Sequence, residues 1–339
     1  MARLTQAIKT LTRLTSLSTR VLADAAGTTA FVQRPPSYTV PAFSGSGGVA
    51  GYFGGGYSAG VLSRIDKIAF PADTKTTLSA TLTSARSFLG GMANSGVAGY
   101  FAGGNDGTVA LSGIDKITFP ADTKTTLSAT LTANTQDAAG MANSGVAGYF
   151  MGGQDGAGNN FSRVDKIAFP ADTKTTISAT LTTARRQGGG MANSGVAGYH
   201  GGGRDSVRLN AIDKIAFPAD TKTTLSATLT AAVSYVAAFA NSGTAGYFAG
   251  GETNTVNSNT IDKITFSADT KTTLSATLTA ARSSLAGMAD SATAGYFGGG
   301  DPSTNIIDKI TFSADTKTTL SATLTASTAD LAGMANGGV

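Results

Sequence analysis

The sequence contains no cysteine and no tryptophan, and it has a single histidine, His200, and a single glutamate, Glu252. Without cysteine the chain forms no disulfide and offers no thiolate, so its redox compartment stays undetermined. A copper site that needs several histidine and cysteine ligands is excluded, and we expect no metal site and no cofactor. No stretch approaches the roughly 18 consecutive apolar residues of a membrane span, so we expect none.

Three short phrases recur six times in the same order along the chain. In the second unit they are residues 99–104 (Gly-Tyr-Phe-Ala-Gly-Gly), 114–119 (Ile-Asp-Lys-Ile-Thr-Phe) and 125–132 (Thr-Thr-Leu-Ser-Ala-Thr-Leu-Thr). The aspartate of the middle phrase returns at intervals of 46 to 50 residues, at Asp66, Asp115, Asp165, Asp213, Asp262 and Asp308. A period of this length indicates a repeat architecture.

Each unit holds four short runs rich in Tyr, Phe, Ile, Thr and Leu and bounded by Gly, Pro, Asn or Asp, which is the pattern of β-strands. In the second unit we predict strands a to d at residues 91–93, 97–103, 114–119 and 125–132. The Asn-Ser-Gly sequence at 94–96 is a hairpin loop between strands a and b, because its glycine accepts the left-handed conformation of such loops. Residues 120–124 form the turn between strands c and d.

Four antiparallel strands per unit, repeated six times, predict an all-β fold in which residues 47–339 form a six-bladed β-propeller. The aromatic pair followed by two glycines, the next strand and the Asp-Thr-Lys-Thr-Thr turn resemble the kelch repeat. Kelch units usually carry a tryptophan on the fourth strand, where this chain has Leu78, Leu127, Ile177, Leu225, Leu274 and Leu320. We expect these aliphatic side chains to fill the space between blades.

The two ends of the repeat region predict how the ring closes. Residues 331–339 reproduce a strand a and its turn without a strand b, whereas residues 47–53 begin a strand b without a strand a of the repeat type. The last residues therefore complete the blade that the first residues begin. Such a mixed blade leaves no unpaired edge at the seam, which favours a closed ring.

The net charge of +4 arises from the first 34 residues, which contain five basic residues and one aspartate, so 5 − 1 = +4 and the remaining 20 Lys and Arg balance 20 Asp and Glu. A neutral ring does not support nucleic-acid binding, and we expect none. Alternating three- and four-residue steps connect Leu4, Ala7, Leu11, Leu14, Ser18 and Val21, so residues 1–26 read as an amphipathic helix whose seam is formed by Leu4, Leu11, Leu14 and Val21. Residues 27–46, rich in proline and glycine, read as an extended linker.

Three interpretations of the N-terminal helix compete. It is an assembly or docking helix that pairs with copies of itself, giving a homo-oligomer such as a trimer, or with another protein. Alternatively it packs on its own propeller, or it is an organelle transit peptide, since such peptides are also rich in arginine and poor in acidic residues. We prefer the assembly helix.

Catalytic residues are not evident in this chain. His200 stands where five other units have phenylalanine, so we interpret it as a strand residue that replaces an aromatic one. The loop that holds Glu252 contains no arginine of its own, which disfavours a sialidase-like site. The twelve aspartates of the Ile/Val-Asp-Lys and Ala-Asp-Thr phrases occur in every unit, and we interpret them as structural. We therefore expect no enzyme activity.

The unlike residues are concentrated in the b–c loops and in the links from strand d to the next strand a. In a four-stranded meander these loops emerge on one side, which we call the loop face, and the repeated a–b and c–d turns emerge on the other, which we call the turn face. Neutral drift would also make loops unlike. As candidate binding residues on the loop face we name Tyr57, Arg185, Arg186, Arg204, Arg208 and Tyr235, because Tyr and Arg most often carry interface energy.

Near-identical repeats behind a short N-terminal segment resemble the kelch-like proteins of bacteriophage tails and fibres, including those of cyanophages. The resemblance implies a non-enzymatic structural and adhesive protein of the virion. Its N-terminal segment would bind other virion proteins, and its loop face would bind a host-surface glycan or receptor. The alternatives are a cytoplasmic or extracellular kelch-like interaction scaffold and a glycan-binding, lectin-like propeller outside a virion.

Overall fold

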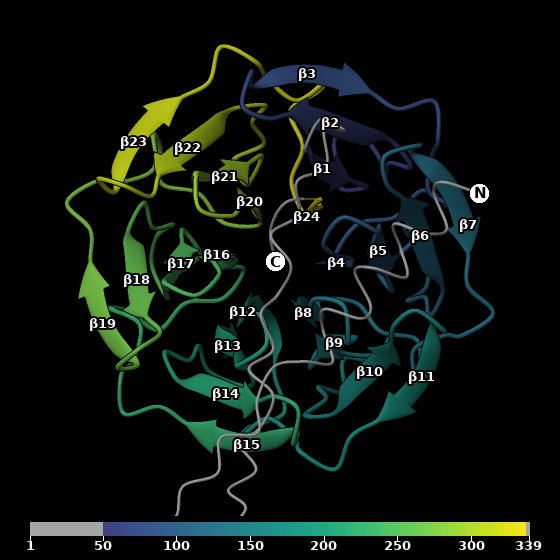
Figure 1. The fold of residues 1–339 in the computed structure, drawn as a ribbon, viewed down its shortest axis with the longest axis horizontal. Coiled ribbons are helices and arrows are strands. Elements are labelled where there is room, and N and C mark those ends of the chain that lie inside the picture. Colours follow the sequence, from purple (N-terminus) through teal and green to yellow (C-terminus); the bar gives the residue numbers. More distant parts are fainter. Residues whose placement is uncertain (1–49, 337–339) are drawn as a thin grey trace, which may run out of the picture. The chain divides into compact units, whose positions relative to one another are not determined.

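The computed structural model describes residues 50–336, and all regular elements in this range are β-strands. They form six four-stranded antiparallel sheets that stand around a central axis as the blades of a propeller (Figure 1). The all-β, six-bladed fold is therefore confirmed. The expected N-terminal helix at 1–26 and the linker at 27–46 lie outside the described residues. Within 50–336 no helix is long and apolar enough to cross a membrane.

The blades follow the chain in order, each listed here from its inner to its outer strand. Blade 1 consists of β24 (Ala332–Ala335), β1 (Ala50–Gly54), β2 (Ile65–Ala69) and β3 (Thr74–Thr77). Blade 2 consists of β4 (Gly90–Asn94), β5 (Ala98–Ala102), β6 (Ile114–Thr118) and β7 (Thr123–Thr126). Blade 3 consists of β8 (Ala139–Asn143), β9 (Ala147–Met151), β10 (Val164–Ala168) and β11 (Thr173–Thr176).

The other three blades have the same arrangement. Blade 4 consists of β12 (Arg186–Asn193), β13 (Ala197–Arg204), β14 (Ile212–Ala216) and β15 (Thr221–Thr224). Blade 5 consists of β16 (Ala237–Asn241), β17 (Ala245–Ala249), β18 (Ile261–Thr265) and β19 (Thr270–Thr273). Blade 6 consists of β20 (Ala286–Asp290), β21 (Ala294–Gly298), β22 (Ile307–Thr311) and β23 (Thr316–Thr319).

The ring closes through blade 1, as the ends of the repeat region predict. Strand β24, from the end of the chain, pairs antiparallel with β1, which places Tyr52 opposite Met334. The yellow strand beside the purple one in Figure 1 is this seam. The pairing covers the inner edge of β1, so the seam has the same four-stranded sheet as the other blades.

Strand d is shorter than predicted and begins earlier. We predicted residues 125–132 in blade 2, whereas β7 spans Thr123–Thr126. Its start is set by Asp122, which turns the chain with φ +55 and brings Thr123 opposite Thr118. Its end is set by the next blade, because the amide and hydroxyl of Thr132 donate to Asp165 there at 2.9 and 2.5 Å. The chain after Thr126 therefore crosses between blades.

The hydrophobic core lies between neighbouring blades. Leu127, at the position of the kelch tryptophan, packs against a cluster that joins Met92 of blade 2 with Phe150 of blade 3, as expected. A tyrosine of strand b also stacks on the phenylalanine after strand c of the next blade, with ring centroids 4.7 to 5.4 Å apart. The six stacked pairs are Tyr52–Phe119, Tyr100–Phe169, Tyr149–Phe217, Tyr199–Phe266, Tyr247–Phe312 and Tyr296–Phe70.

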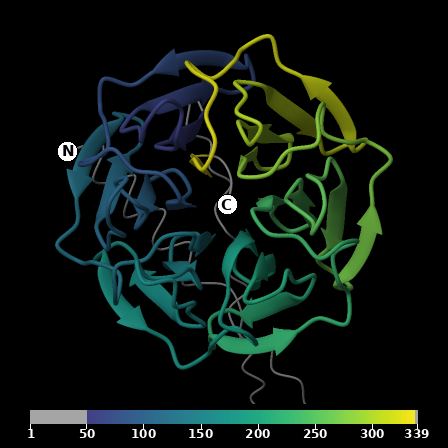
Figure 2. The same ribbon diagram turned by 180° about the vertical axis from the view of Figure 1, so that it is seen from behind.

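The loop face and the turn face are separated as the meander predicts. The end of each d–a link pairs with the start of the b–c loop of the blade that it enters, as Ser87 does with Asn105. The a–b turns contact one another around the axis, as when Asn94 accepts the amide of Gly145 in the next blade at 2.7 Å. Figure 2 shows the ring from the side opposite to that of Figure 1.

Candidate functional site

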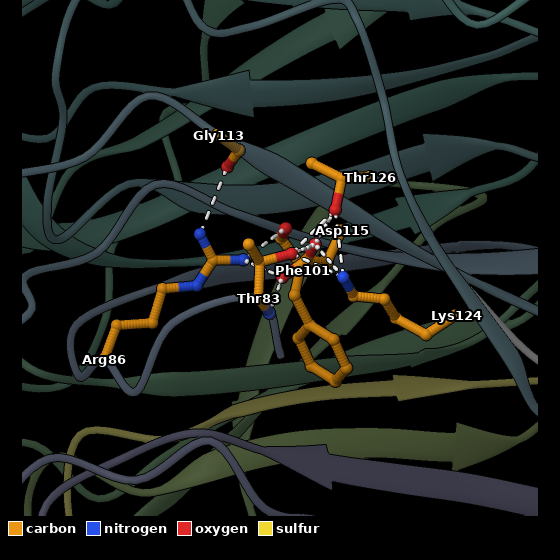
Figure 3. A network of polar contacts seen from close by, with 7 residues as sticks. All are labelled: Thr83, Arg86, Phe101, Gly113, Asp115, Lys124 and Thr126. Atoms are coloured by element: carbon orange, nitrogen blue, oxygen red, sulfur yellow. Dashed lines mark hydrogen bonds and ion pairs between the residues drawn. The ribbon is translucent and has the colours of Figure 1, made fainter. Parts of the chain in front are cut away.

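A buried aspartate of strand c holds each blade to the link from the blade before it. In blade 2, Asp115 accepts the amide and hydroxyl of Thr83 at 2.8 and 2.6 Å and the hydroxyl of Thr126 at 2.9 Å (Figure 3). Arg86 and Lys124 complete the cluster with nitrogens 3.0 and 3.5 Å from its carboxylate. Burial alone would raise the pKa of Asp115, but these hydrogen bonds and the Arg86 charge hold it below its usual range.

Arg185 belongs to such a cluster, and its prediction as a loop-face residue is wrong. Its side chain is 0% exposed, and its guanidinium lies 2.9 Å from Asp213 and 3.3 Å from the carbonyl oxygen of His200. Arg86 and Arg282 hold the same place in blades 2 and 6. The guanidinium turns inward because the buried aspartate attracts it, and the shared repeat position could have predicted this.

The arginine of this cluster varies around the ring. In blade 3 Thr135 takes the place of Arg86, and Arg163 from the b–c loop approaches the aspartate at 3.8 Å instead. Blade 1 uses Arg64 in the same way. In blade 5 the position holds Val233, and the contacts described for Asp262 come from Thr230, Thr273 and Lys271. A cavity of about 20 Å³ lies beside Val233 there.

The second repeat aspartate, in the c–d turn, links the outer parts of neighbouring blades. Asp122 accepts the hydroxyl of Tyr52 at 2.7 Å and the ammonium of Lys67 at 2.6 Å, both from the preceding blade. Equivalent pairs recur around the ring and close it, since Tyr296 and Lys309 of blade 6 donate to Asp73 of blade 1. Both sets of repeat aspartates therefore have inter-blade contacts, in agreement with the structural interpretation.

A ring of six residues surrounds the axis on the loop face, and we call it the axial mouth. Each residue stands two positions after the Arg86 position, where a d–a link passes into the inner strand, and each has a left-handed backbone with φ between 55° and 63°. The amide of each donates to the carbonyl oxygen of the one before it at 2.7 to 3.1 Å, so the hydrogen bonds form a closed circle. The six residues are Phe88, Asp137, Gln187, Tyr235, Ser284 and Asp330.

The side chains of the axial mouth are unlike one another although their backbones are equivalent. Phe88 and Tyr235 come from opposite blades and meet at the axis, with ring centroids 6.4 Å apart and planes tilted by 43°. A cavity of about 90 Å³ is lined by all six mouth residues. Of the predicted binding residues, Tyr235 is therefore the one that the structure places at the axis.

The two carboxyls of the mouth have raised pKa values. Burial raises the pKa of Asp137 to about 7, and the nearby Asp330 adds to this rise, whereas Gln187 and Arg186 oppose it. Burial also raises the pKa of Asp330 to about 6, against a hydrogen bond from Ser284. The amides of Gln187 and Gln154 each donate to the Asp137 carboxylate at 3.3 Å.

The other predicted residues surround the mouth at a greater distance from the axis. Arg186 and Arg204 lie opposite each other at the ends of β12 and β13, and both are partly exposed. Arg208 forms an ion pair of 2.6 Å with Glu252 of the next blade. Tyr57, in the b–c loop of blade 1, is 47% exposed and is the most accessible of the predicted set.

The single histidine is buried, and the single glutamate is in an ion pair. His200 is 1% exposed inside β13, where burial and the charge of Arg185 lower its pKa to about 3. It is thus a buried replacement for phenylalanine, as predicted. Glu252 has an arginine partner after all, because Arg208 reaches it from the neighbouring blade. Within residues 50–336 no group of three metal-ligating side chains is brought together.

Five of the mouth residues, Phe88, Asp137, Gln187, Ser284 and Asp330, were not found from the sequence. The signal was present, because aligning the units places them at one position with five residue types in six units. A search against models of known protein families finds no match for this chain, and no curated protein matches it either. The assignment of function therefore rests on the fold and on this site.

Proposed function

We propose that the protein is a non-enzymatic interaction module in which a rigid propeller presents its loop face to a partner. The observation that supports this most is the contrast between two sets of equivalent positions. The inter-blade aspartates, tyrosines and lysines are the same in every blade, whereas the six positions of the axial mouth carry five residue types. A binding surface needs such variety, because a ligand without sixfold symmetry contacts each blade differently.

We further propose that the module is a structural and adhesive part of a virion appendage, such as a tail fibre. The resemblance of the repeats to kelch-like bacteriophage proteins motivates this proposal. Residues 1–46 would attach the ring to other virion proteins, with self-association through Leu4, Leu11, Leu14 and Val21. The loop face would then bind a host-surface glycan or receptor, or a neighbouring virion protein.

The absence of enzyme activity is part of the same proposal. His200 is inaccessible, and Glu252 is engaged by Arg208 at 2.6 Å. Asp137 and Asp330 are the carboxyls with raised pKa values at the axis, and two amide side chains hold the first of them. A glycan that binds to the purified protein should therefore be recovered uncleaved.

The test compares Tyr57→Ala combined with Arg204→Ala on the loop face with Val146→Ala on the turn face, and Tyr57 and Val146 are each 47% exposed. Full-length protein is applied to an array of bacterial surface glycans and to purified virions, and its melting temperature is measured in parallel. We expect Tyr57→Ala combined with Arg204→Ala to weaken binding about tenfold or more while Val146→Ala changes nothing. Loss of binding in Val146→Ala alone would assign function to the turn face, and cleavage of a bound glycan would refute the non-enzymatic assignment.

A further inference from the structure

The axial mouth contains an acceptor without a donor. Gln187 is 7% exposed, its amide nitrogen donates to Asp137, and its side-chain oxygen has no hydrogen-bond partner among the described residues. A buried acceptor without a hydrogen-bond partner is destabilising, so a ligand that donates to it removes that cost. Because Gln187 lines the 90 Å³ cavity, a ligand that donates to its side-chain oxygen would bind in the mouth.

The other residues that line the mouth favour a positively charged donor. Asp137 and Asp330 contribute two carboxyls on either side of Phe88, and none of the six mouth residues is basic. The charge of Arg186, one position before the mouth in blade 4, acts to lower the pKa of Asp137, and its guanidinium donates to Asn160 at 2.9 Å. Farther out, Asp301 faces Asp330, and Glu252 is paired with Arg208. The mouth itself is therefore acidic.

The aromatic pair adds a second attraction for a cation. The rings of Phe88 and Tyr235 meet at the axis, and the electron-rich face of an aromatic ring attracts an ammonium group. Burial and the two carboxyls raise the pKa of the Tyr235 hydroxyl, so this side chain stays neutral beside them. Two aromatic rings, two carboxyls and a free amide oxygen together form a lining that suits a primary ammonium.

The size of the cavity restricts what carries this ammonium. An engineered cavity of about 150 Å³ holds one benzene molecule, so a volume of about 90 Å³ between aromatic rings 6.4 Å apart favours a narrow ligand over a sugar ring. A chain of methylene groups is narrow enough to enter between the side chains. We infer that the axial mouth binds the ammonium end of a lysine side chain that a partner protein inserts along the propeller axis. This inference depends on the proposed role of the loop face as an interaction surface.

The ammonium requires ionised carboxylates, which gives the binding a defined dependence on pH. With pKa values of about 7 and about 6 in the free protein, Asp137 and Asp330 are protonated at pH 5 and ionised at pH 8. Binding of the cation favours the ionised forms and releases protons, so affinity rises with pH across this window. Asp137 alone, protonated two units below its pKa, predicts a gain of up to about 100-fold between pH 5 and pH 8.

The experiment uses full-length protein and ligand-observed NMR titration with Nα-acetyl-lysine methylamide. The matched neutral probe is the same compound acetylated on its side-chain nitrogen, and glucosamine tests an amino sugar as the source of the ammonium. At pH 8 we expect the lysine probe to bind at least tenfold more tightly than both of the others. Its affinity should fall at least tenfold at pH 5.

The variants assign the effect to the mouth. Asp137→Asn with Asp330→Asn should weaken the lysine probe at least tenfold and remove the pH dependence, whereas Asp106→Asn, on an exposed b–c loop, should change neither. Equal binding of the charged and acetylated probes to the unmodified protein would overturn the inference without any variant. Tighter binding of glucosamine would overturn the lysine assignment. If the lysine probe fails but Tyr57→Ala still weakens adhesion, the axial inference falls and the proposed function stands.

Discussion

Replacing the same repeat aspartate by alanine should destabilise blades 2 and 5 by different amounts. In blade 2, Asp115→Ala leaves the guanidinium of Arg86, 2% exposed, with only backbone carbonyl oxygens as partners. In blade 5, Asp262→Ala leaves no buried guanidinium, because Val233 takes the place of that arginine. The two aspartates otherwise accept equivalent hydrogen bonds from two threonines and have equivalent lysine neighbours.

The expected difference in stability loss follows from the buried Arg86 charge that remains in Asp115→Ala. Removing one partner of a buried ion pair costs about 3–5 kcal/mol, since the other charge stays buried and uncompensated. Removing an acceptor from neutral donors that can turn towards water costs about 1–3 kcal/mol. We therefore expect losses in the free energy of unfolding of about 4 kcal/mol for Asp115→Ala and about 2 kcal/mol for Asp262→Ala.

Equilibrium unfolding in urea measures this difference, and urea is preferred to guanidinium chloride because it does not screen the ion pairs. The double variant Asp115→Ala with Arg86→Val removes both charges and reproduces in blade 2 the situation of Asp262→Ala in blade 5. It should recover about 2 kcal/mol relative to Asp115→Ala alone. Equal losses for the two single variants, or no recovery in the double variant, would refute the assignment of the cost to the buried guanidinium.

Four further predictions concern the ring and its N-terminal segment. Deleting residues 331–339 removes β24 and exposes the inner edge of β1, so the protein should lose several kcal/mol and aggregate on heating, as light scattering would show. Gly140→Ala places a methyl group 2.1 Å from a carbonyl oxygen of the neighbouring inner strand and should cost about 1–3 kcal/mol in urea unfolding, whereas Gly60→Ala, with no atom within 4 Å, should cost nothing measurable. Val233→Arg should raise the melting temperature by supplying the missing guanidinium of blade 5. If residues 1–26 form the expected assembly helix, Leu11→Asp should abolish self-association in sedimentation, because a charge in the seam of that helix would have no partner.

The architecture was predictable from the sequence because each blade repeats the same strand and turn sequences. The recurring aspartate predicted the number of blades, and the repeat elements at the two ends predicted that blade 1 closes the ring. Neither prediction required knowledge of a contact between units. The limits of strand d were not predictable from the pattern of one unit. Thr132 leaves its own sheet because Asp165 of the next blade binds it, and that contact is visible only when two blades stand side by side.

The candidate site was predictable only in part, and for a related reason. Choosing arginine and tyrosine from unlike segments selected Tyr235, which lies at the axis, and also Arg185, which is buried. Arg185 stands at a position that three units fill with arginine, so its role resembles that of the repeated residues. The mouth residues lie two positions later, where the units agree in backbone conformation and differ in side chain.

The backbone of the mouth argues that its side chains are needed there. A left-handed conformation costs a residue with a Cβ atom roughly 1–2 kcal/mol, and glycine avoids this cost. Elsewhere in residues 50–336 this conformation is adopted by glycine in every blade, as at Gly103 and Gly104 after strand b, by the aspartates whose carboxylates bind the preceding blade, as at Asp122, and by Ala292 in the a–b turn of blade 6. At the mouth the circle of hydrogen bonds involves only amides and carbonyls, which glycine would supply equally well. None of the six residues is glycine, so the strain is retained at positions whose side chains the backbone circle does not require, and this supports the proposal that these side chains take part in binding.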